Sequence, residues 1–297
     1  MRGIISRFAP APTGFLHLGH VVNASTVWRE TRARSGRVLL RIEDHDRQRS
    51  RRQFEDAILE DLAWLGFEAD EPPVRQSERG AIYEDALERL RGQGLVYVCD
   101  CSRSDVAQAF RPAGAGLPRS PEGFGEARRS SRAWSASGGG KPRATPELRY
   151  PGTCRDRGLD DAPGRGLRVR LEPLLERFVD LRLGSQEQRP SEQCGDLLAR
   201  DRDGNWTYQF AATVDDYVQG VNLVIRGVDL LASTGRQIQL ARLLGRAEPP
   251  AFLHHPLIMK SSEQKLSKSD GDSGVRELRA AGWTREQVLD AAFAALT

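Results

Sequence analysis

The 297-residue sequence contains no apolar run long enough to cross a membrane, and Arg7 and the nearby prolines interrupt any secretory leader at its start. It contains only four cysteines. We therefore expect a cytoplasmic protein, in which cysteines serve as thiols or metal ligands because disulfides seldom persist there. The net charge is only +3, so any contact with nucleic acid must use a local basic face.

Lysine is also scarce. Four lysines stand against 40 arginines, and three of the four lie at positions 260, 265 and 268. Residues 265–269 read K-L-S-K-S, with serine and glycine on both sides. Compact ammonium groups suit a phosphate site, and the flanking composition is typical of a loop that closes on its ligand. The cluster therefore predicts a phosphate-binding loop near the C-terminal end.

A second candidate phosphate site lies near the N-terminus, where residues 7–20 read R-F-A-P-A-P-T-G-F-L-H-L-G-H. The apolar run at 4–8 predicts a short buried strand, prolines then break regular structure, and a helical pattern resumes after Gly19. A strand that leads through a turn into a helix N-terminus commonly binds phosphate. His17 and His20 can donate hydrogen bonds to phosphoryl oxygens there, and the alternative is a structural turn with capped or solvated histidines.

Strand and helix patterns alternate along most of the chain. We predict strands at residues 38–42, 95–99 and 221–225, regular structure of unspecified type at 167–171 and 178–183, and helices at 50–65, 81–90, 233–244, 275–281 and 284–296. Thr284 is the expected N-cap of the last helix, and the turn residues Asp203-Gly204-Asn205 predict a hairpin over 196–210. The alternation predicts an α/β fold with a Rossmann-like, doubly wound parallel sheet and a short helical C-terminus.

An irregular segment interrupts this pattern. Residues 110–146 are rich in Gly, Pro, Ser, Ala and Arg, so we expect them to be disordered. Between residues 102 and 149, nine basic and four acidic residues give a local charge of 9 − 4 = +5. The segment is either a solvated insert or a basic arm that contacts RNA backbone.

Cysteines lie on both sides of this segment. Cys99 and Cys101 precede it and Cys154 follows it. Two thiolates one residue apart can bind one ion, whereas a disulfide across C-x-C would be strained. The alternatives are a metal site and reduced cysteines without metal. Cys194 is either an idle buried thiol or a reserve ligand.

Charged residues at predicted strand ends form another candidate site. Arg7 and Glu43 both follow strands at the edge where open α/β sheets bind ligands, and Glu43 can pair with an ammonium group. Arg226 ends a buried strand and suits bidentate capture of a carboxylate. The alternatives are a surface salt bridge at Glu43 and a pair between Arg226 and Asp229.

Several motifs together resemble a known family. The stretch P-x-P-T-G-x-L-H-x-G-H at 10–20 and K-L-S-K-S at 265–269 resemble the two signatures of class I aminoacyl-tRNA synthetases. The wording R-F-A-P-x-P-T-G, together with R-I-E-D at 41–44, is similar to the glutamyl branch. The resemblance covers nearly the whole chain apart from the irregular segment.

The resemblance implies sites for glutamate and ATP. It places glutamate against Arg7, Phe8, Ala9, Pro10, Ala11, Glu43, Tyr208 and Arg226. It places ATP, with Mg²⁺, against His17, Gly19, His20, Lys265, Ser267 and Lys268, and it makes His17, His20 and Lys268 the catalytic residues. Glu43 would hold the α-amino group and Arg226 the side-chain carboxylate. Ala11 stands where the family usually has serine, so one hydroxyl contact is in doubt.

The chain most resembles the short glutamyl-Q tRNA(Asp) synthetases within this family. Residues 150–154 read Y-P-G-T-C, which is similar to half of their zinc site, so the resemblance implies structural Zn²⁺ on Cys99, Cys101, Tyr150 and Cys154. Only 28 residues follow Ser269, where full-length glutamyl-tRNA synthetases continue with an anticodon-reading region. The short enzymes attach glutamate to the queuosine base in the anticodon of tRNA(Asp).

We therefore expect four segments: half of the catalytic core at 1–98, an inserted zinc-containing subdomain at 99–195, the other half of the core at 196–260, and the K-L-S-K-S loop with short helices at 261–297, without an anticodon-binding domain. The expected enzyme is a monomer that forms glutamyl-adenylate and transfers glutamate to queuosine in tRNA(Asp). The alternatives are a truncated glutamyl-tRNA synthetase that charges a tRNA 3′ end, a catalytically silent RNA-binding module and a small-molecule adenylyltransferase.

Overall fold

The computed structural model describes residues 3–109, 148–258 and 274–295. The segment 110–146, which we expected to be disordered, lies outside these residues. Among the helices that are described, none combines the length and the apolar character needed to span a membrane.

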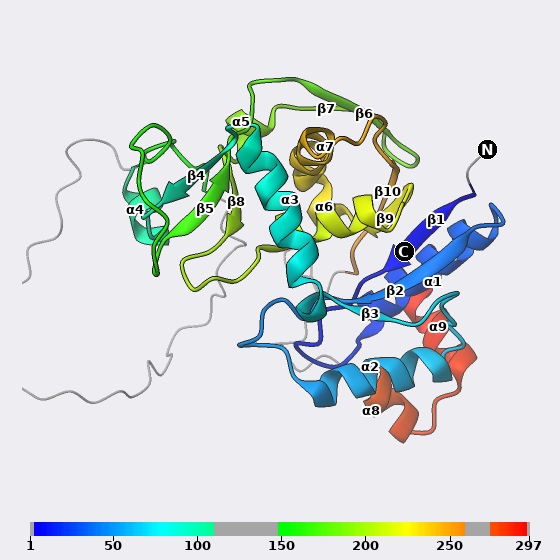
Figure 1. Cartoon of the computed structure of the whole chain (residues 1–297). Helices are drawn as coiled ribbons and strands as arrows, with labels where there is room; N and C mark the ends of the chain where they lie inside the picture. The colour runs from blue at the N-terminus through cyan, green and yellow to red at the C-terminus, as the bar shows by residue number, and fades with distance from the viewer. Residues whose placement is uncertain (1–2, 110–147, 259–273, 296–297) are drawn as a thin grey trace, which may run out of the picture.

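Two sheets of mainly parallel strands form the centre of the molecule (Figure 1). The first has the order β1 (Ile5–Phe8), β2 (Arg37–Ile42) and β3 (Val74–Arg75). The second has the order β7 (Gly184–Gln188), β6 (Glu176–Asp180), β10 (Ala251–His255) and β9 (Leu223–Gly227), in which only β7 is antiparallel.

The predicted single sheet is therefore divided at a seam between β1 and β9, which lie in contact. The amide of Ile5 donates to the side-chain oxygen of Asn222 at 2.8 Å, and the amide of Asn222 donates to the Ile5 carbonyl at 3.0 Å. Because a side chain replaces a backbone acceptor there, no regular ladder joins the strands. The α/β class is confirmed, whereas the prediction of one continuous sheet is wrong.

Strand side chains alternate between two apolar cores. Val38 and Leu40 of β2 point into one core, while Leu39 between them packs with Phe178 and Ile238 in another. Such burial of both faces is typical of parallel sheets and explains why the strands read as continuous apolar runs.

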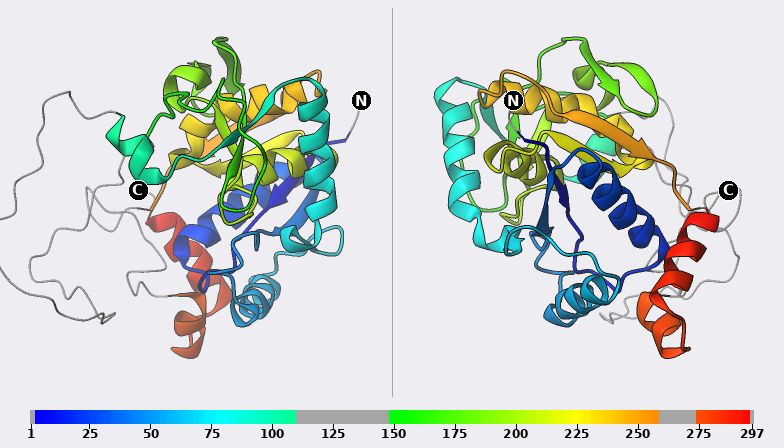
Figure 2. Two further views of the ribbon diagram at one scale, coloured as in Figure 1. Left: turned by 60° about the vertical axis from the view of Figure 1, so that its left-hand side comes forward. Right: turned by 90° about the vertical axis from the view of Figure 1, so that its right-hand side faces the viewer.

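Helices cover both faces. The first core is shared by α1 (Leu18–Arg32), α2 (Arg52–Trp64), α8 (Val275–Ala280) and α9 (Arg285–Ala294). α1 packs against α9, as Figure 2 shows, and Thr284 caps α9 as predicted by accepting the Gln287 amide. On the other face lie α6 (Tyr208–Val218), the turn η2 (Val228–Ser233) and α7 (Thr234–Leu243).

A third, antiparallel sheet lies beside this centre. It consists of β4 (Val96–Cys99), β5 (Gly166–Val169) and β8 (Leu197–Arg200), near the short helices α4 (Arg103–Gln108) and α5 (Pro190–Gln193). Its core is shared with α3 (Gly80–Gly92), which follows η1 (Gln76–Glu78). The expected insert at 99–195 thus contributes β5 to this sheet, but β6 and β7 to the second parallel sheet.

The hairpin predicted over 196–210 is wrong. β8 forms, but only one bridge, between Arg200 and Trp206, follows the turn before α6 begins at Tyr208. A helix forms instead of a second strand because helical spacing buries Phe210 and Val214 in the core shared with α3. The amide of Thr207 donates to the Ala199 carbonyl at 2.9 Å and fixes the point at which the strand gives way to the helix.

Candidate active site

The two histidines of the N-terminal signature close the first turn of α1. His17 is the N-cap, and its Nδ1 accepts the Gly19 amide at 3.0 Å. His20 reaches back so that its Nδ1 accepts the His17 amide at 3.1 Å, which places the two rings 3.9 Å apart. Since Nδ1 is an acceptor in both rings, each neutral imidazole carries its proton on Nε2. The turn thus fixes two Nε2–H donors at a helix N-terminus, where an anion is favoured.

A second group of expected site residues lies in a buried ionic network. Asp216 in α6 accepts from Arg7 Nε at 3.0 Å and from Arg41 Nη1 at 2.7 Å. Arg41 Nη2 also donates to Glu43 at 3.2 Å. All four side chains are buried, so Glu43 is not part of the surface salt bridge that we considered. The network brings Arg7 and Glu43, two expected glutamate-binding residues, to one place.

Two pKa shifts follow from this network. Burial would raise the pKa of Asp216, but the adjacent guanidinium groups of Arg7 and Arg41 hold it below its usual value. Burial raises the pKa of Glu43 despite the opposing charges of Arg41 and Arg7. A ligand ammonium group beside Glu43 would favour its charged form.

Asp215, next to Asp216, extends the network through three further hydrogen bonds. It accepts hydrogen bonds from Arg79 at 2.6 Å, from Gln76 at 2.8 Å and from the Tyr83 hydroxyl at 2.8 Å. Because the Gln76 amide group points at Asp215, its oxygen is left to accept from His45 Nδ1 at 2.6 Å. Asp215 thereby fixes the His45 ring 6.4 Å from the ring of Tyr208.

Arg226 has a different environment. Its Nε donates to His254 Nε2 at 3.0 Å, Nη1 to Gln237 Oε1 at 2.6 Å and Nη2 to Thr234 Oγ1 at 2.8 Å. These acceptors are neutral, and no described carboxylate, Asp229 included, lies within ion-pair distance. These bonds use three of the five N–H groups, and the Tyr208 side chain also interacts with the guanidinium. Burial and the nearby Arg7 lower the pKa of Arg226.

Tyr208 interacts with the ionic network and with Arg226. Burial raises the pKa of its hydroxyl, with a contribution from Glu43, while Arg226 and Arg7 oppose that shift. The phenol therefore lies within electrostatic reach of all three residues. Two guanidinium groups, a carboxylate and a phenol are thus brought close together.

The residues between Arg7 and the signature turn have mixed orientations. The Phe8 side chain is 1 % exposed and packs edge-to-face on Trp28, so it belongs to the apolar core. The Pro10 carbonyl accepts the Glu43 amide at 3.0 Å and ties this segment to the end of β2. Ala9 and Ala11 are half-buried.

The expected ATP residues Lys265, Ser267 and Lys268 lie outside the described residues. The described residues on either side of that segment are next to the first signature. Gly274 forms a bridge with His17, and the Val275 amide donates to the Leu16 carbonyl at 2.9 Å. Ile258 is buried in the core that contains Leu16.

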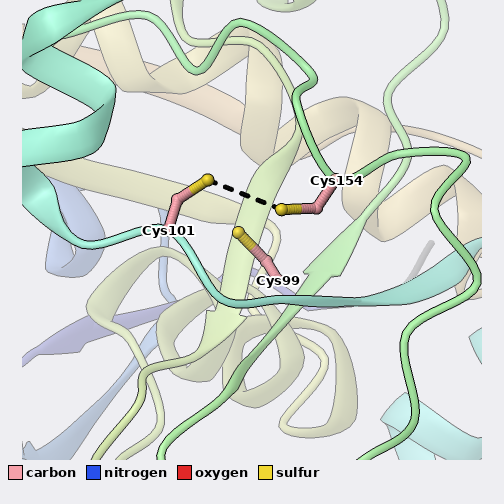
Figure 3. A group of neighbouring side chains, drawn as sticks. All are labelled: Cys99, Cys101 and Cys154. Atoms are coloured by element: carbon pink, nitrogen blue, oxygen red, sulfur yellow. Dashed lines mark hydrogen bonds between the residues drawn. The ribbon is translucent and has the colours of Figure 1, made fainter.

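Three cysteines converge at the end of β4 (Figure 3). The sulfur atoms of Cys99, Cys101 and Cys154 lie within 4.8 Å of one another, and those of Cys101 and Cys154 are 3.5 Å apart. A tetrahedral ion with Zn–S bonds of about 2.3 Å needs sulfurs about 3.8 Å apart. The Tyr150 hydroxyl lies 3.4 Å from Cys99 Sγ, so the expected fourth ligand is at the cluster. The donor set therefore fits zinc.

Two arginines surround these sulfurs. Arg168 Nε donates to Cys99 Sγ at 3.3 Å, with its guanidinium carbon 3.6 Å from the centre of the Tyr150 ring. Arg157 donates to Cys154 Sγ at 3.4 Å. Burial and the two neighbouring thiols raise the pKa of Cys101 to about 12. All four cysteines are free thiols, and Cys194 lies outside the cluster, bonded to the Pro190 carbonyl.

The sequence analysis assigned no role in the site to Arg41, Asp215, Asp216 or His254. The signal available in the sequence was the presence of charged residues within otherwise apolar segments, at position 41 in β2 and at positions 215–216 in α6. Such charges must find partners, although the sequence does not say which.

Most of the chain matches one known protein family. The model of the family "tRNA synthetases class I (E and Q), catalytic domain" matches residues 3–134 and 168–294. A protein of Burkholderia cenocepacia named glutamyl-Q tRNA(Asp) synthetase is 40% identical over 288 residues, covering 94% of this chain and 87% of that protein. A protein of the same name from Rhodobacter capsulatus is 38% identical over 291 residues, covering 94% and 96%.

A solved structure is also similar. The crystal structure of a glutamate tRNA ligase from Elizabethkingia meningosepticum in complex with its amino acid aligns with a TM-score of 0.69 at 26% identity. The alignment covers 91% of this chain and 53% of that one, so the chain spans about half the length of this solved relative.

Proposed function

Because this chain belongs to the class I tRNA synthetase family for glutamate and glutamine, and is therefore a ligase, we propose that it activates L-glutamate with ATP and transfers the glutamyl group to queuosine in the anticodon of tRNA(Asp). The names of the two curated relatives support this choice of RNA. We expect the enzyme to act as a monomer in the cytoplasm.

The observation that carries the glutamate assignment is the set of charged groups gathered around Tyr208. Glutamate brings two carboxylates and one ammonium group, and this set offers Arg7, Arg226 and Glu43. Arg226 is 3 % exposed and bonded only to neutral acceptors, so an anion would gain most there. We assign Arg226 to the side-chain carboxylate, Tyr208 to a substrate hydrogen bond and Glu43 to the α-amino group.

The first step needs positioning more than covalent help from the protein. The glutamate α-carboxylate attacks the α-phosphorus of ATP, so a carboxyl–phosphate anhydride forms and the bond to pyrophosphate breaks. The Nε2–H groups of His17 and His20 donate to phosphoryl oxygens as charge builds there. In this proposal Lys268 stabilises the charge on pyrophosphate, with Lys265 and Ser267 beside it and Mg²⁺ on the triphosphate.

In the second step a hydroxyl of the modified base attacks the glutamyl carbonyl carbon, an ester forms and AMP leaves. Pyrophosphate exchange tests the first step: exchange with glutamate, but not with glutamine or aspartate, is expected. Absence of exchange with glutamate would remove the assignment. Radiolabelled glutamate should then attach to tRNA(Asp) from queuosine-producing cells and not to tRNA(Asp) that lacks queuosine.

A truncated glutamyl-tRNA synthetase is the second candidate, favoured by the similarity to the glutamate tRNA ligase structure. Mapping the label separates the two candidates, because nuclease fragments would carry it either at the anticodon stem or at the 3′ end. A silent RNA-binding module would show neither exchange nor label. An adenylyltransferase for another small molecule would use ATP but would not exchange with glutamate.

We propose that Cys99, Cys101, Cys154 and Tyr150 hold a structural zinc ion. The ion would cross-link the end of β4 to residues 150–154 and would take no part in the reaction. Metal analysis of the purified protein should find one zinc per chain, and Cys154→Ser should release it. Cys194→Ser is the matched control and should keep the metal. An equal zinc content in both variants would contradict the site.

A further inference from the structure

Behind Arg226 lies a hydrogen-bonded chain that crosses three adjacent strands. Asp180 is in β6, His254 in β10 and Arg226 in β9, and His254 and Arg226 are register partners. All three side chains are at most 3 % exposed. His254 Nδ1 lies 2.7 Å from Asp180 Oδ2, and its Nε2 lies 3.0 Å from Arg226 Nε.

The contacts fix the direction of each hydrogen bond. Asp180 accepts four hydrogen bonds: Oδ1 from the amides of Arg182 and Leu183, and Oδ2 from the amide and the Nδ1 of His254. Arg226 has only donors. The ring must therefore carry its proton on Nδ1, where it meets the carboxylate, so that the lone pair of Nε2 faces Arg226 Nε at 3.0 Å and the Thr234 hydroxyl at 3.3 Å.

This arrangement orients a cation without neutralising it. A carboxylate in direct contact with Arg226 would compete with a bound carboxylate for the same guanidinium. The neutral ring places the Asp180 charge one residue away. Burial and Arg226 both lower the pKa of His254, which keeps the ring neutral. The ring centre of Phe252 lies 6.1 Å from that of His254 and 5.8 Å from the guanidinium carbon of Arg226, so Phe252 packs against both side chains.

We propose that His254 is a positioning residue that aims Arg226 at the substrate carboxylate, and that Asp180 acts by fixing the tautomer of His254. The inference rests on the proposed function, in which Arg226 binds glutamate. It deepens that function by adding the residues that determine the orientation of the binding group.

Asp180→Asn is a sharp test because it changes no shape. One end of the new amide must be an NH₂ group facing donors. The Oδ1 position faces two backbone amides that cannot change, whereas the Oδ2 position faces one such amide, that of His254, and a ring that can move its proton. The NH₂ group therefore takes the Oδ2 position, and the ring proton moves to Nε2. There it opposes Arg226 Nε–H, and the aim of Arg226 is lost.

The expected results are a rise of about tenfold or more in KM for glutamate and a change of less than about twofold in KM for ATP, measured by pyrophosphate exchange. ¹⁵N and ¹³C NMR of the histidine rings should show the His254 proton on Nδ1 in the wild type and on Nε2 in Asp180→Asn. His254→Gln, whose side-chain oxygen can accept from Arg226, should retain more glutamate affinity than His254→Leu. Asp70→Asn is the control. It removes the charge of an exposed carboxylate that accepts a hydrogen bond from the Val38 amide, and it should leave both KM values unchanged.

A wild-type His254 with its proton on Nε2 would overturn the proposal, and this measurement needs no variant to fold. Equal increases in both KM values, or an unchanged glutamate KM in both Asp180→Asn and His254→Leu, would also overturn it. If the wild type showed no exchange with glutamate, the proposed function would fail. The tautomer measurement would still report separately whether Asp180 fixes the ring.

Discussion

Arg41 and Arg226 are both buried guanidinium groups on neighbouring parts of the central sheets, but their surroundings have opposite electrostatic character. Arg41 is 0 % exposed and lies within ion-pair distance of Glu43, Asp215 and Asp216. Arg226 is 3 % exposed and is bonded to a ring nitrogen, an amide and a hydroxyl.

The two pKa shifts express this difference. Burial lowers the pKa of both arginines, but at Arg41 the three carboxylates outweigh burial and raise it, whereas at Arg226 burial prevails. One charge is compensated by carboxylates within the fold, and the other is bonded to neutral acceptors. Residue type and burial alone therefore do not tell whether an arginine has a counterion.

The largest expected effect is on stability at the compensated site. Arg41→Met leaves three buried carboxylates without their shared partner, so the free energy of unfolding should fall by about 3–5 kcal/mol. Thermal and urea unfolding would measure the loss.

Arg37→Met in the same strand is the matched control for that change. It removes the exposed pair with Glu71 and should cost about 1 kcal/mol or less. Equal losses in the two variants would show that Arg41 is not the centre of the network.

Arg226→Met should weaken substrate binding and not stability, which is the reverse of the expectation for Arg41→Met. Loss of two charge-assisted hydrogen bonds to the substrate carboxylate should weaken glutamate binding by about 3 kcal/mol, which is about a hundredfold. Stability should stay the same or rise, because a buried cation without a counterion is removed. Calorimetric titration with glutamate and a melting curve measure both quantities. A destabilised variant with normal affinity would break the comparison.

Asp61 is a buried acidic residue that has neither counterions like those of Arg41 nor neutral hydrogen-bond partners like those of Arg226. Both of its carboxylate oxygens lack a hydrogen-bond partner among the described residues, and burial raises the pKa of Asp61 from 3.8 to about 6. The folded state therefore binds this proton more tightly than the unfolded chain, so stability declines as the pH rises from about 4 to 6.

Asp61→Asn should accordingly gain about 1–2 kcal/mol of unfolding free energy at pH 7, and the gain should shrink below pH 4. Urea unfolding across that range would measure it. A gain that is independent of pH would mean that packing, not charge, is responsible.

The smallest expected effect concerns a neutral contact. Ala11→Ser restores the hydroxyl that the family resemblance leads us to expect, and one added hydrogen bond is worth about 1 kcal/mol, so KM for glutamate should fall by about fivefold or less. KM for ATP should not change. Pyrophosphate exchange measures both constants, and an unchanged or higher glutamate KM would place Ala11 outside the glutamate contacts.

Much of the fold could be predicted from local patterns. The apolar runs of β1, β2, β4 and β9, and the helical spacing of α2, α3 and α7, are confirmed within a few residues. β10 and the helix at Tyr208 were missed. In both cases neighbours distant in sequence determine the element: β10 is completed by pairing with β6 and β9, and α6 by packing against α3.

The sequence by itself determined most of the strands and helices and the histidine turn, because each depends on residues close together in the chain. Only the tertiary structure decided which arginine has a counterion. Asp216 reaches Arg7 and Arg41 from more than 170 residues away, and Asp180 and His254 are 74 residues apart. Electrostatic energy depends on distance in space and on burial, and neither is written in the local sequence.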